Sequence, residues 1–227
     1  REWSGHDVAR EFYVNDAGNQ INKFGASLSV RYLQLFEGEE KHPLPEDCYQ
    51  GMDILDHARE FAKLYGDKYV NAPEEERRKA LVDYALPLNI AALERDLGRY
   101  RIHYDVWFRE SVLHREGKVT AICEKLKENG WAYEKEGALW YNNIKMMIEK
   151  AKKAGKPLSE AEIAELKDDV LVRANGVPTY FAADIAYHYN KFAERGFHRV
   201  INIWGADHHG HVARLKGAMD AVGLDGN

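Results

Sequence analysis

The sequence has few cysteines, no long apolar run and no excess of positive charge. Cys48 and Cys123 are its only cysteines, and their separation matches no metal-binding motif. We therefore expect both to be reduced, structural thiols of a cytosolic protein. No apolar run approaches the roughly 20 residues of a membrane span and no signal peptide precedes Arg1, so we expect no membrane association.

The composition is that of a folded protein. Its 227 residues suffice for one large domain or two small ones, with 45% hydrophobic and 30% charged residues. The net charge of −5 argues against a general nucleic-acid coat but leaves a local RNA contact open. Because the sequence begins in a polar segment and without Met, we expect an excised piece of a longer protein.

One stretch near the C-terminal end, Arg199–His211, combines an apolar run with a polar cluster. The run Val200–Trp204 predicts a strand that stops at Gly205, and a helix with one apolar face begins near Val212. Acidic and imidazole side chains lie between the two: Asp207, His208, His209 and His211. An open α/β sheet presents reactive groups in this way, at the carboxyl end of a strand.

The N-terminal segment has the same layout. Glu11–Val14 predicts a strand, and the apolar positions of the helix that follows are Ile21, Phe24, Leu28, Tyr32 and Leu35. The polar turn between them holds Asn15, Asp16, Gly18 and Gln20. Glycine lets a backbone approach a ligand, and amide and carboxylate side chains supply oriented hydrogen bonds. A plain turn with an Asx cap explains the same residues equally well.

The middle of the chain is predicted to be mostly helical. A linker, Gly38–Asp47, precedes helices over residues 48–98, with Pro87 kinking or ending the second. The expected apolar stripes are Met52, Leu55, Ala58 and Ala62, then Leu81, Tyr84, Ala85 and Leu88. Alternation predicts a strand over Arg101–Phe108. The helix after it ends at Gly130 and buries Val119, Ile122, Cys123 and Leu126.

Two hairpins are predicted in the second half, over residues 131–141 and 170–181. Glu136-Gly137 turns the first, and Asn175-Gly176 turns the second as a type I′ turn. The lysine- and glutamate-rich residues 142–168 predict a solvated helix pair, with Ser159 and Glu162 as a capping box. An RNA-facing patch through lysines 145–156 is the alternative. A helix over residues 181–196 follows.

Because the sheet-forming pieces lie at both ends of the chain, we predict an α/β protein. Its sheet would be doubly wound and interrupted by mostly helical insertions.

Three acidic or phenolic side chains are candidates for holding a ligand. Tyr180 and Asp184 are four residues apart on a predicted helix and share a face, which suits a guanidinium because its planar fork takes two charge-assisted bonds from a carboxylate. The alternative is an acidic residue favoured by the helix dipole. Glu110 follows a predicted strand at the same sheet edge if the strands are parallel, although alone it is an ordinary surface glutamate.

The cluster GADHHGH at 205–211 allows three interpretations. Its side chains are suitable metal ligands, but adjacent histidines on a turn rarely converge on one ion. His208 and His211 match HxGH, the layout that holds ATP phosphates, and predict a nucleotidylyltransferase or metal-dependent phosphoesterase. Gly205 and Asp207 match a GxD turn, whose carboxylate would accept hydrogen bonds from a ribose hydroxyl pair.

Taken together, the motifs resemble an internal piece of a bacterial arginyl-tRNA synthetase, a class I aminoacyl-tRNA synthetase. The matching segments are REFYVNDAGNQI (10–21), YDVWFRES (104–111), VLVRANGVPTYFAADIAYH (170–188) and INIWGADHHGHVARLKGA (201–218). They occur in family order and cover essentially the whole chain, except that residues 142–168 depart from the pattern. The runs YFAADIAYH and WGADHHGHV are the most specific.

The resemblance implies a fold and a set of ligand contacts. The Rossmann-like catalytic core would comprise residues 1–40, 101–112 and 170–227, with a helical insertion at 41–100 and a second insertion at 113–169. The expected arginine contacts are Glu110, Tyr180, Asp184 and Asn15, with Asp16, Gly18 and Gln20 in the turn beside the pocket. The expected contacts to ATP, at its adenosine, are Gly205, Asp207 and His208.

The resemblance also implies a reaction and its requirements. The parent enzyme would join arginine to ATP as arginyl-adenylate and pass the arginyl group to tRNA(Arg), with Mg²⁺ accompanying ATP and no protein-bound metal. It would be cytoplasmic and monomeric. The family's own HxGH and KMSKS motifs should lie outside this sequence, so we expect the isolated piece to be inactive, to contain no confidently assigned catalytic residue, and to use 208–211 for something other than phosphate binding.

Overall fold

The computed structural model describes residues 4–226, apart from the side chains of Asp207 and His209. The chain divides into two compact units, Arg1–Arg109 and Glu110–Asn227, which are taken one at a time below. No helix in the described part of the chain combines the length and the apolar character needed to cross a membrane.

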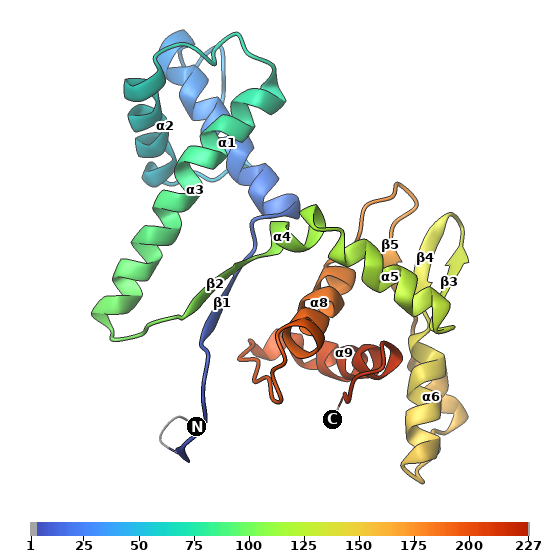
Figure 1. Ribbon diagram of the computed structural model, residues 1–227. Coiled ribbons are helices and arrows are strands. Elements are labelled where there is room, and N and C mark those ends of the chain that lie inside the picture. The colour runs from blue at the N-terminus through green and yellow to red at the C-terminus, as the bar shows by residue number, and fades with distance from the viewer. Residues whose placement is uncertain (1–3, 227) are drawn as a thin grey trace. The chain divides into compact units, whose positions relative to one another are not determined.

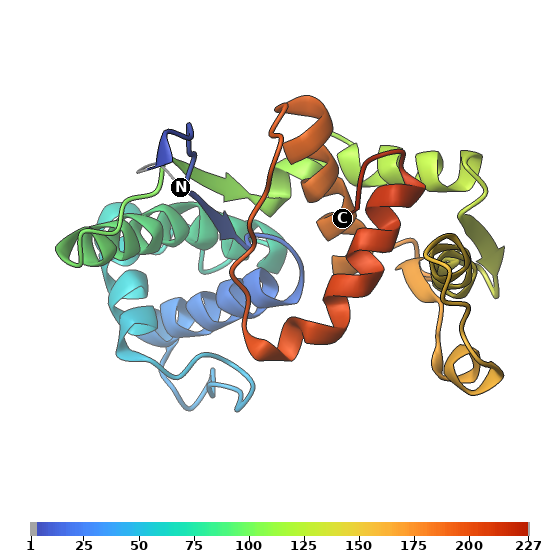
Figure 2. The same ribbon diagram turned by 90° about the horizontal axis from the view of Figure 1, so that it is seen from below.

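A short parallel sheet joins the two ends of the first unit. Strand β1 (Glu11–Val14) pairs with β2 (Val106–Arg109), and Figures 1 and 2 both show the two strands side by side. Phe12 of β1 lies 4.9 Å from Trp107 of β2, ring centre to ring centre. The predicted strand at 11–14 is therefore confirmed. The predicted strand at 101–108 is shorter at its start, because Arg101 adopts a positive φ of 61° that interrupts an extended backbone.

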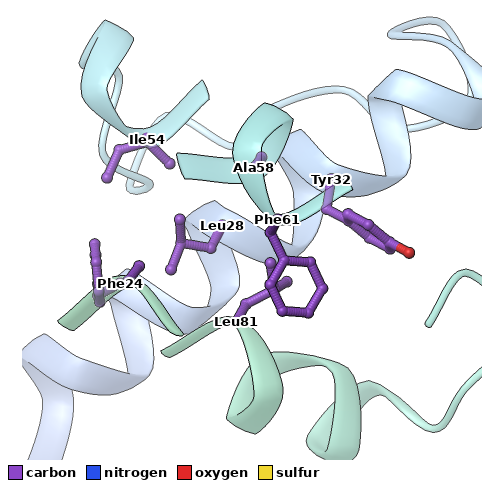
Figure 3. Close-up of a cluster of buried hydrophobic side chains, with 8 residues drawn as sticks. Phe24, Leu28, Tyr32, Ile54, Ala58, Phe61 and Leu81 are labelled. Carbon is purple, nitrogen blue, oxygen red and sulfur yellow. The ribbon is translucent and has the colours of Figure 1, made fainter. Parts of the chain in front are cut away.

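Three helices form the core of the first unit: α1 (Gly18–Glu37), α2 (Met52–Tyr65) and α3 (Glu74–Arg99). Figure 3 shows the side chains that meet between them, which are Phe24, Leu28, Tyr32, Ile54, Ala58, Phe61 and Leu81. The predicted stripe on the second helix was wrong, because Met52 is 61% exposed while Ile54 and Phe61 are buried. Both stripes pass through Ala58, and the larger Phe61 ring lies on the face that packs against the other helices.

The third helix continues through Pro87 to Arg99, so the predicted end of the helix at this proline was wrong. Proline lacks the N–H that would bond the carbonyl of Asp83 one turn earlier. Asp83 and Pro87 are both exposed, so water can bond that carbonyl and the helix can continue.

A buried arginine fixes the loop between α2 and α3. The Arg77 guanidinium is buried and donates hydrogen bonds to Ser29 Oγ at 2.8 Å and to the carbonyl oxygens of Tyr69, Val70 and Ala72 at 3.3, 3.3 and 2.9 Å. An arginine keeps its charge, and a buried charge needs hydrogen-bonding partners. The carbonyl groups of the loop supply three of those partners, so the loop and the helix bundle stabilise each other.

We predict that Arg77→Met lowers the free energy of unfolding by about 2–3 kcal/mol, because three loop carbonyls lose their donor. Urea denaturation followed by circular dichroism measures the change. Lys79→Met is the matched control, since Lys79 is an exposed cation two residues away that forms a surface ion pair with Asp83. An equal loss in both variants would contradict the role of Arg77.

The second unit combines a small antiparallel sheet with helices. Its elements in chain order are α4 (Glu110–Arg115), α5 (Lys118–Glu128), β3 (Ala132–Lys135), β4 (Ala138–Tyr141), α6 (Asn143–Lys153), α7 (Glu160–Glu165), β5 (Asp169–Val172), α8 (Tyr180–Tyr189), a π-helical turn (Asn190–Glu194), a 3-10 turn (Ala206–His208) and α9 (His209–Ala221). The strands are ordered β3-β4-β5. Helix α8 contacts α5 and α9, and all three are labelled in Figure 1.

The first predicted hairpin is confirmed and the second is corrected. Glu136 and Gly137 have φ values of 53° and 75°, as the two central residues of a type I′ turn require. At Asn175-Gly176 only the glycine has a positive φ, so the turn is not type I′. The second hairpin closes with a single bridge between Val172 and Pro178, while β5 pairs with β4 instead.

The lysine-rich segment is a helix pair with a confirmed capping box. Ser159 accepts from the Glu162 backbone N–H, and the Glu162 carboxylate accepts from the Ser159 backbone N–H at 2.8 Å. Two lysines of the proposed RNA-facing patch make contacts within the unit. Lys145 lies 4.4 Å from the centre of the Trp131 ring, and Lys150 pairs with Asp220. These contacts favour the interpretation of a structural helix pair.

The apolar run before Gly205 does not form the predicted strand. Residues 199–205 have no regular structure, and Ile201 and Ile203 are 62% and 95% exposed. A strand needs the backbone of a neighbouring strand, and within residues 4–226 no strand pairs with this run. The structure is mixed α/β and mostly helical, and its only parallel pair in that range is β1 with β2.

Candidate functional site

Helix α8 carries two of the predicted ligand residues and is held firmly at its start. Thr179 caps the helix, since its hydroxyl accepts from the Ala182 backbone N–H at 3.4 Å and donates to the Val170 carbonyl at 2.7 Å. The hydroxyl thereby links the helix to β5. Tyr180 is 49% exposed, whereas the Asp184 side chain one turn later is 24% exposed. The helix therefore presents a phenol toward solvent and turns the carboxylate inward.

Two histidines donate hydrogen bonds to the Asp184 carboxylate. Nδ1 of His188 lies 3.1 Å from Asp184 Oδ1 and 2.9 Å from the Asp184 carbonyl oxygen. Nε2 of His211 lies 2.5 Å from Asp184 Oδ2. Each carboxylate oxygen therefore has one imidazole partner. Because a carboxylate oxygen has two lone pairs, each oxygen keeps capacity for one further donor.

The hydrogen bonds continue outward from both histidines. Arg214 donates from Nε to His211 Nδ1 at 3.0 Å and from Nη1 to Asp169 Oδ1 at 2.7 Å. On the other side, the Asn202 amide nitrogen lies 2.9 Å from His188 Nε2, and Lys191 Nζ lies 3.4 Å from Asn202 Oδ1. We call this set the Asp184 network, and its members are Asp169, Asp184, His188, Lys191, Asn202, His211 and Arg214.

The surroundings favour the ionised form of Asp184. Burial raises the pKa of the Asp184 carboxyl, but the hydrogen bonds from His188 and His211 lower it more, so the net pKa lies well below its usual value. At Asp169 burial prevails, and its pKa is raised although Arg214 opposes the shift. Asp184 is therefore a carboxylate at neutral pH in a partly dry setting.

Aromatic rings form an apolar wall beside the network. The Trp204 ring centre lies 5.3 Å from His211, 5.7 Å from His208 and 6.2 Å from His188. Phe181 packs edge-on against His211 at 5.6 Å. The wall limits the water that reaches the imidazoles, which strengthens their hydrogen bonds to Asp184.

Glu110 is buried rather than a surface glutamate. It opens α4 directly after β2, its side chain is 5% exposed, and its Oε1 lies 3.4 Å from His114 Nε2. A buried carboxylate needs charged or hydrogen-bonding partners, so burial makes Glu110 a stronger ligand candidate than its sequence position alone did.

The turn after β1 differs from a plain capped turn. Ala17 is the N-cap of α1 and offers no side-chain acceptor, so the Asx-cap interpretation was wrong. Gly18 begins the helix with a φ of 72°, which favours glycine, while Gln20 lies exposed in the first helical turn. Among the described residues, the buried Oδ1 of Asn15 has no hydrogen-bond partner. Such an atom is available to a donor from a ligand.

The predicted ribose contacts are only partly described. Gly205 is exposed, and His208 ends the 3-10 turn with its backbone N–H bonded to the Gly205 carbonyl at 3.1 Å. The Asp207 side chain, predicted to bind the ribose, lies outside the described residues. Within the described side chains, which also leave out His209, no three metal-ligating groups meet.

The structure thus brings together residues that the sequence analysis treated separately. His211 contacts both Asp184 and Trp204. Five members of the network were not among the predicted residues: Asp169, His188, Lys191, Asn202 and Arg214. Helical spacing was a usable signal for two of them, because His188 is four residues after Asp184 and Arg214 is three after His211.

Comparison with known proteins shows which enzymes this chain resembles. No protein-family model matches the sequence. The arginine–tRNA ligase of Ruminiclostridium cellulolyticum is 53% identical over 222 residues, which are 98% of this chain and 36% of that protein. The arginine–tRNA ligase of Caldanaerobacter subterraneus subsp. tengcongensis is 54% identical over 226 residues, which are 100% of this chain and 37% of that protein. The chain is homologous to a part of the arginine–tRNA ligases.

The solved structures agree with this ligase homology. An arginyl-tRNA synthetase structure from Campylobacter jejuni matches 98% of this chain with a TM-score of 0.80 and 34% identity, and 44% of that chain is covered. The match covers both compact units of this chain. The segment spans little more than a third of the length of the curated ligases.

We predict that Asp184→Asn lowers the free energy of unfolding by about 2 kcal/mol at pH 7, because one imidazole N–H then faces an amide N–H. A carboxyl with a lowered native pKa stabilises the fold above its unfolded pKa, and this contribution is lost as pH falls toward the native pKa. The difference between variant and wild type should therefore shrink below about pH 4. Urea denaturation at several pH values measures it, and an undiminished difference at pH 3 would contradict the assignment.

Proposed function

We propose that the chain supplies the arginine pocket and part of the adenosine site of an arginine–tRNA ligase. The observation that carries the proposal is the inward-facing, ionised Asp184 with one free lone-pair site on each oxygen, in a segment homologous to those ligases. A guanidinium has parallel N–H groups that fit a carboxylate edge, so arginine is the ligand that this group suits best.

Two further side chains of the second unit complete the proposed pocket. Tyr180 is exposed on the same helix and offers a hydroxyl, and Glu110 is a buried carboxylate. In the proposal, Glu110, Tyr180 and Asp184 bind the guanidinium. In the first unit, the buried oxygen of Asn15 has no partner among the described residues, and the family resemblance suggests it as a further arginine contact, with Asp16, Gly18 and Gln20 in the same turn.

The proposed pocket would select for charge and shape. A neutral analogue such as citrulline would leave buried carboxylates without a cation, and sites of that kind reject a ligand by ~10⁴-fold or more. Lysine would keep the charge but lose the two parallel hydrogen bonds.

The adenosine end of the site is proposed to lie at the turn before α9. Gly205 would let the backbone approach the ribose, Asp207 would accept from its hydroxyl pair, and His208 would lie beside it. ATP would arrive as its Mg²⁺ complex, and no residue of this chain is assigned to that ion.

In the proposed reaction, arginine attacks the α-phosphate of ATP and releases pyrophosphate. The terminal adenosine of tRNA(Arg) then accepts the arginyl group from the arginyl-adenylate, and AMP leaves. Positioning and charge stabilisation account for most of the catalysis in such displacements. The residues of this chain would hold and orient arginine and the ribose. We propose a cytoplasmic, monomeric parent enzyme.

The proposed fold of the longer protein explains the unpaired apolar run. Residues 1–40, 101–112 and 170–227 would form a Rossmann-like core, with insertions at 41–100 and 113–169. Residues 200–204 would become a strand there by pairing with a strand from outside this sequence. The 62% and 95% exposure of Ile201 and Ile203 supports this proposal, since a strand in the middle of a parallel sheet is buried on both faces.

The alternative, a nucleotidylyltransferase or phosphoesterase centred on His208–His211, has less support. Both ring nitrogens of His211 are occupied, one by Asp184 and one by Arg214. An imidazole held in this way is not available to a phosphate or a metal ion.

We predict that Asp184→Ala in the full-length ligase raises the KM for arginine by at least about tenfold and leaves the KM for ATP nearly unchanged. The physical reason is that, of the two substrates, the Asp184 side chain contacts only arginine in the proposal. Arginine-dependent pyrophosphate exchange measures both constants. Equal losses for the two substrates would remove Asp184 from the arginine pocket.

We also predict that the purified 227-residue chain lacks arginine-dependent pyrophosphate exchange, because the phosphate-binding motifs expected of the family are not in this sequence. The full-length ligase assayed in parallel is the positive control. Robust exchange by the 227-residue chain would show that residues 1–227 hold a complete activation site.

A further inference from the structure

The contacts of His211 determine which of its nitrogens carries the proton. Arg214 Nε is always a donor, so His211 Nδ1, 3.0 Å away, must accept. The proton of the neutral ring is then on Nε2, which donates to Asp184 Oδ2. A proton on Nδ1 would face the Arg214 N–H, so Nδ1 is the acceptor of this pair.

The contacts of His188 determine the opposite tautomer. Its Nδ1 faces two oxygen acceptors, both of them on Asp184, and must carry the proton. Its Nε2 therefore accepts from the Asn202 amide nitrogen at 2.9 Å. Lys191, a donor only, lies 3.4 Å from Asn202 Oδ1 and fixes the orientation of that amide.

We propose that Arg214 and Asn202 are positioning residues that set the arginine specificity of the site by holding His211 and His188 as neutral donors to Asp184. The proposal rests on the proposed function. Asp184 then keeps a full negative charge for a ligand, and each imidazole presents a neutral ring rather than a competing cation. Within the described residues Asn202 contacts His188 and Arg214 contacts His211, and neither contacts Asp184, so both act through the histidines.

The charged groups around the histidines are consistent with this arrangement. Asp184 and His188 come from α8, His211 and Arg214 from α9, Asp169 from β5 and Lys191 from the π-helical turn. Asp169 pairs with Arg214 at 2.7 Å and holds its guanidinium in place behind His211. The two cations, Arg214 and Lys191, thus lie on the outer side of the network, away from the carboxylate that would bind the ligand.

Nitrogen-15 NMR of histidine-labelled full-length ligase tests the tautomers directly. His188→Gln and His211→Gln assign the two sets of ring signals by their loss. We expect the proton on Nδ1 of His188 and on Nε2 of His211 at pH 7. Arg214→Met should free His211 to take up a second proton or to exchange tautomers. The same tautomers in wild type and in Arg214→Met, or the opposite ones in wild type, would overturn the proposal.

Steady-state kinetics of the full-length ligase test the consequence for arginine. Arg214→Met should raise the KM for arginine about tenfold, with the KM for ATP unchanged. Lys216→Met is the matched control, because it removes an exposed cation from the same helix two residues away and should change neither constant. His211→Gln keeps an N–H toward Asp184 and should retain more arginine affinity than His211→Leu. Equal arginine affinities of His211→Gln and His211→Leu would overturn the role of the donated proton.

The outcomes separate the two proposals. If the wild-type protein shows no arginine-dependent exchange, the proposed function fails, while the tautomer measurement still tests the network. If the wild type is active and Arg214→Met matches it in the KM for arginine, the positioning role alone fails. Circular dichroism of each variant, with Arg214→Lys as a second variant that keeps the pair with Asp169, separates loss of fold from loss of positioning.

Discussion

The second unit depends on keeping one partly buried carboxylate charged. Taking a carboxylate out of water costs several kcal/mol unless charged or hydrogen-bonding partners replace the water. Two imidazole N–H groups do so at Asp184, and their hydrogen bonds outweigh the effect of burial on its pKa. Because the partners come from α8 and α9, the carboxylate also holds these two helices in a fixed relation.

This arrangement explains why a mostly helical unit can present a defined anion. The apolar face of α8 packs inward, and seven of its ten residues are buried. Asp184 is one of the other three, and its carboxylate contacts His188 and His211. The rings of these histidines pack against Trp204, and that of His211 also packs against Phe181. A site with few waters and fixed donors is pre-organised for a charged ligand, which lowers the cost of binding.

Local rules predicted most of the secondary structure. Strand β1, the hairpin at Glu136-Gly137 and the capping box at Ser159 each depend on residues close in sequence, and all three are confirmed. The predicted strand at residues 200–204 failed because a strand depends on a partner, and no partner is present in the described part of the chain. The register of α2 failed for a similar reason, since its buried face is set by α1 and α3.

The candidate site was predicted in part. Spacing put Tyr180 and Asp184 on one helix, and the family resemblance supplied their expected role. The link from Asp184 to His211 spans 27 residues and crosses from one helix to another, so no local pattern contains it. Asn202 was missed for the same reason, because its partner His188 lies 14 residues away on another element. Arg214 is only three residues from its partner His211, so its spacing was a local signal that was not used.

In the proposed complex, a guanidinium binds the Asp184 carboxylate while His188 and His211 still contact it. A crystal structure of the full-length ligase with arginine tests this most directly. We expect guanidinium nitrogens about 2.7–3.2 Å from the Asp184 carboxylate oxygens, with His188 and His211 still donating to the same group. Arginine bound away from Asp184, or a His211 ring displaced from that carboxylate, would contradict the account.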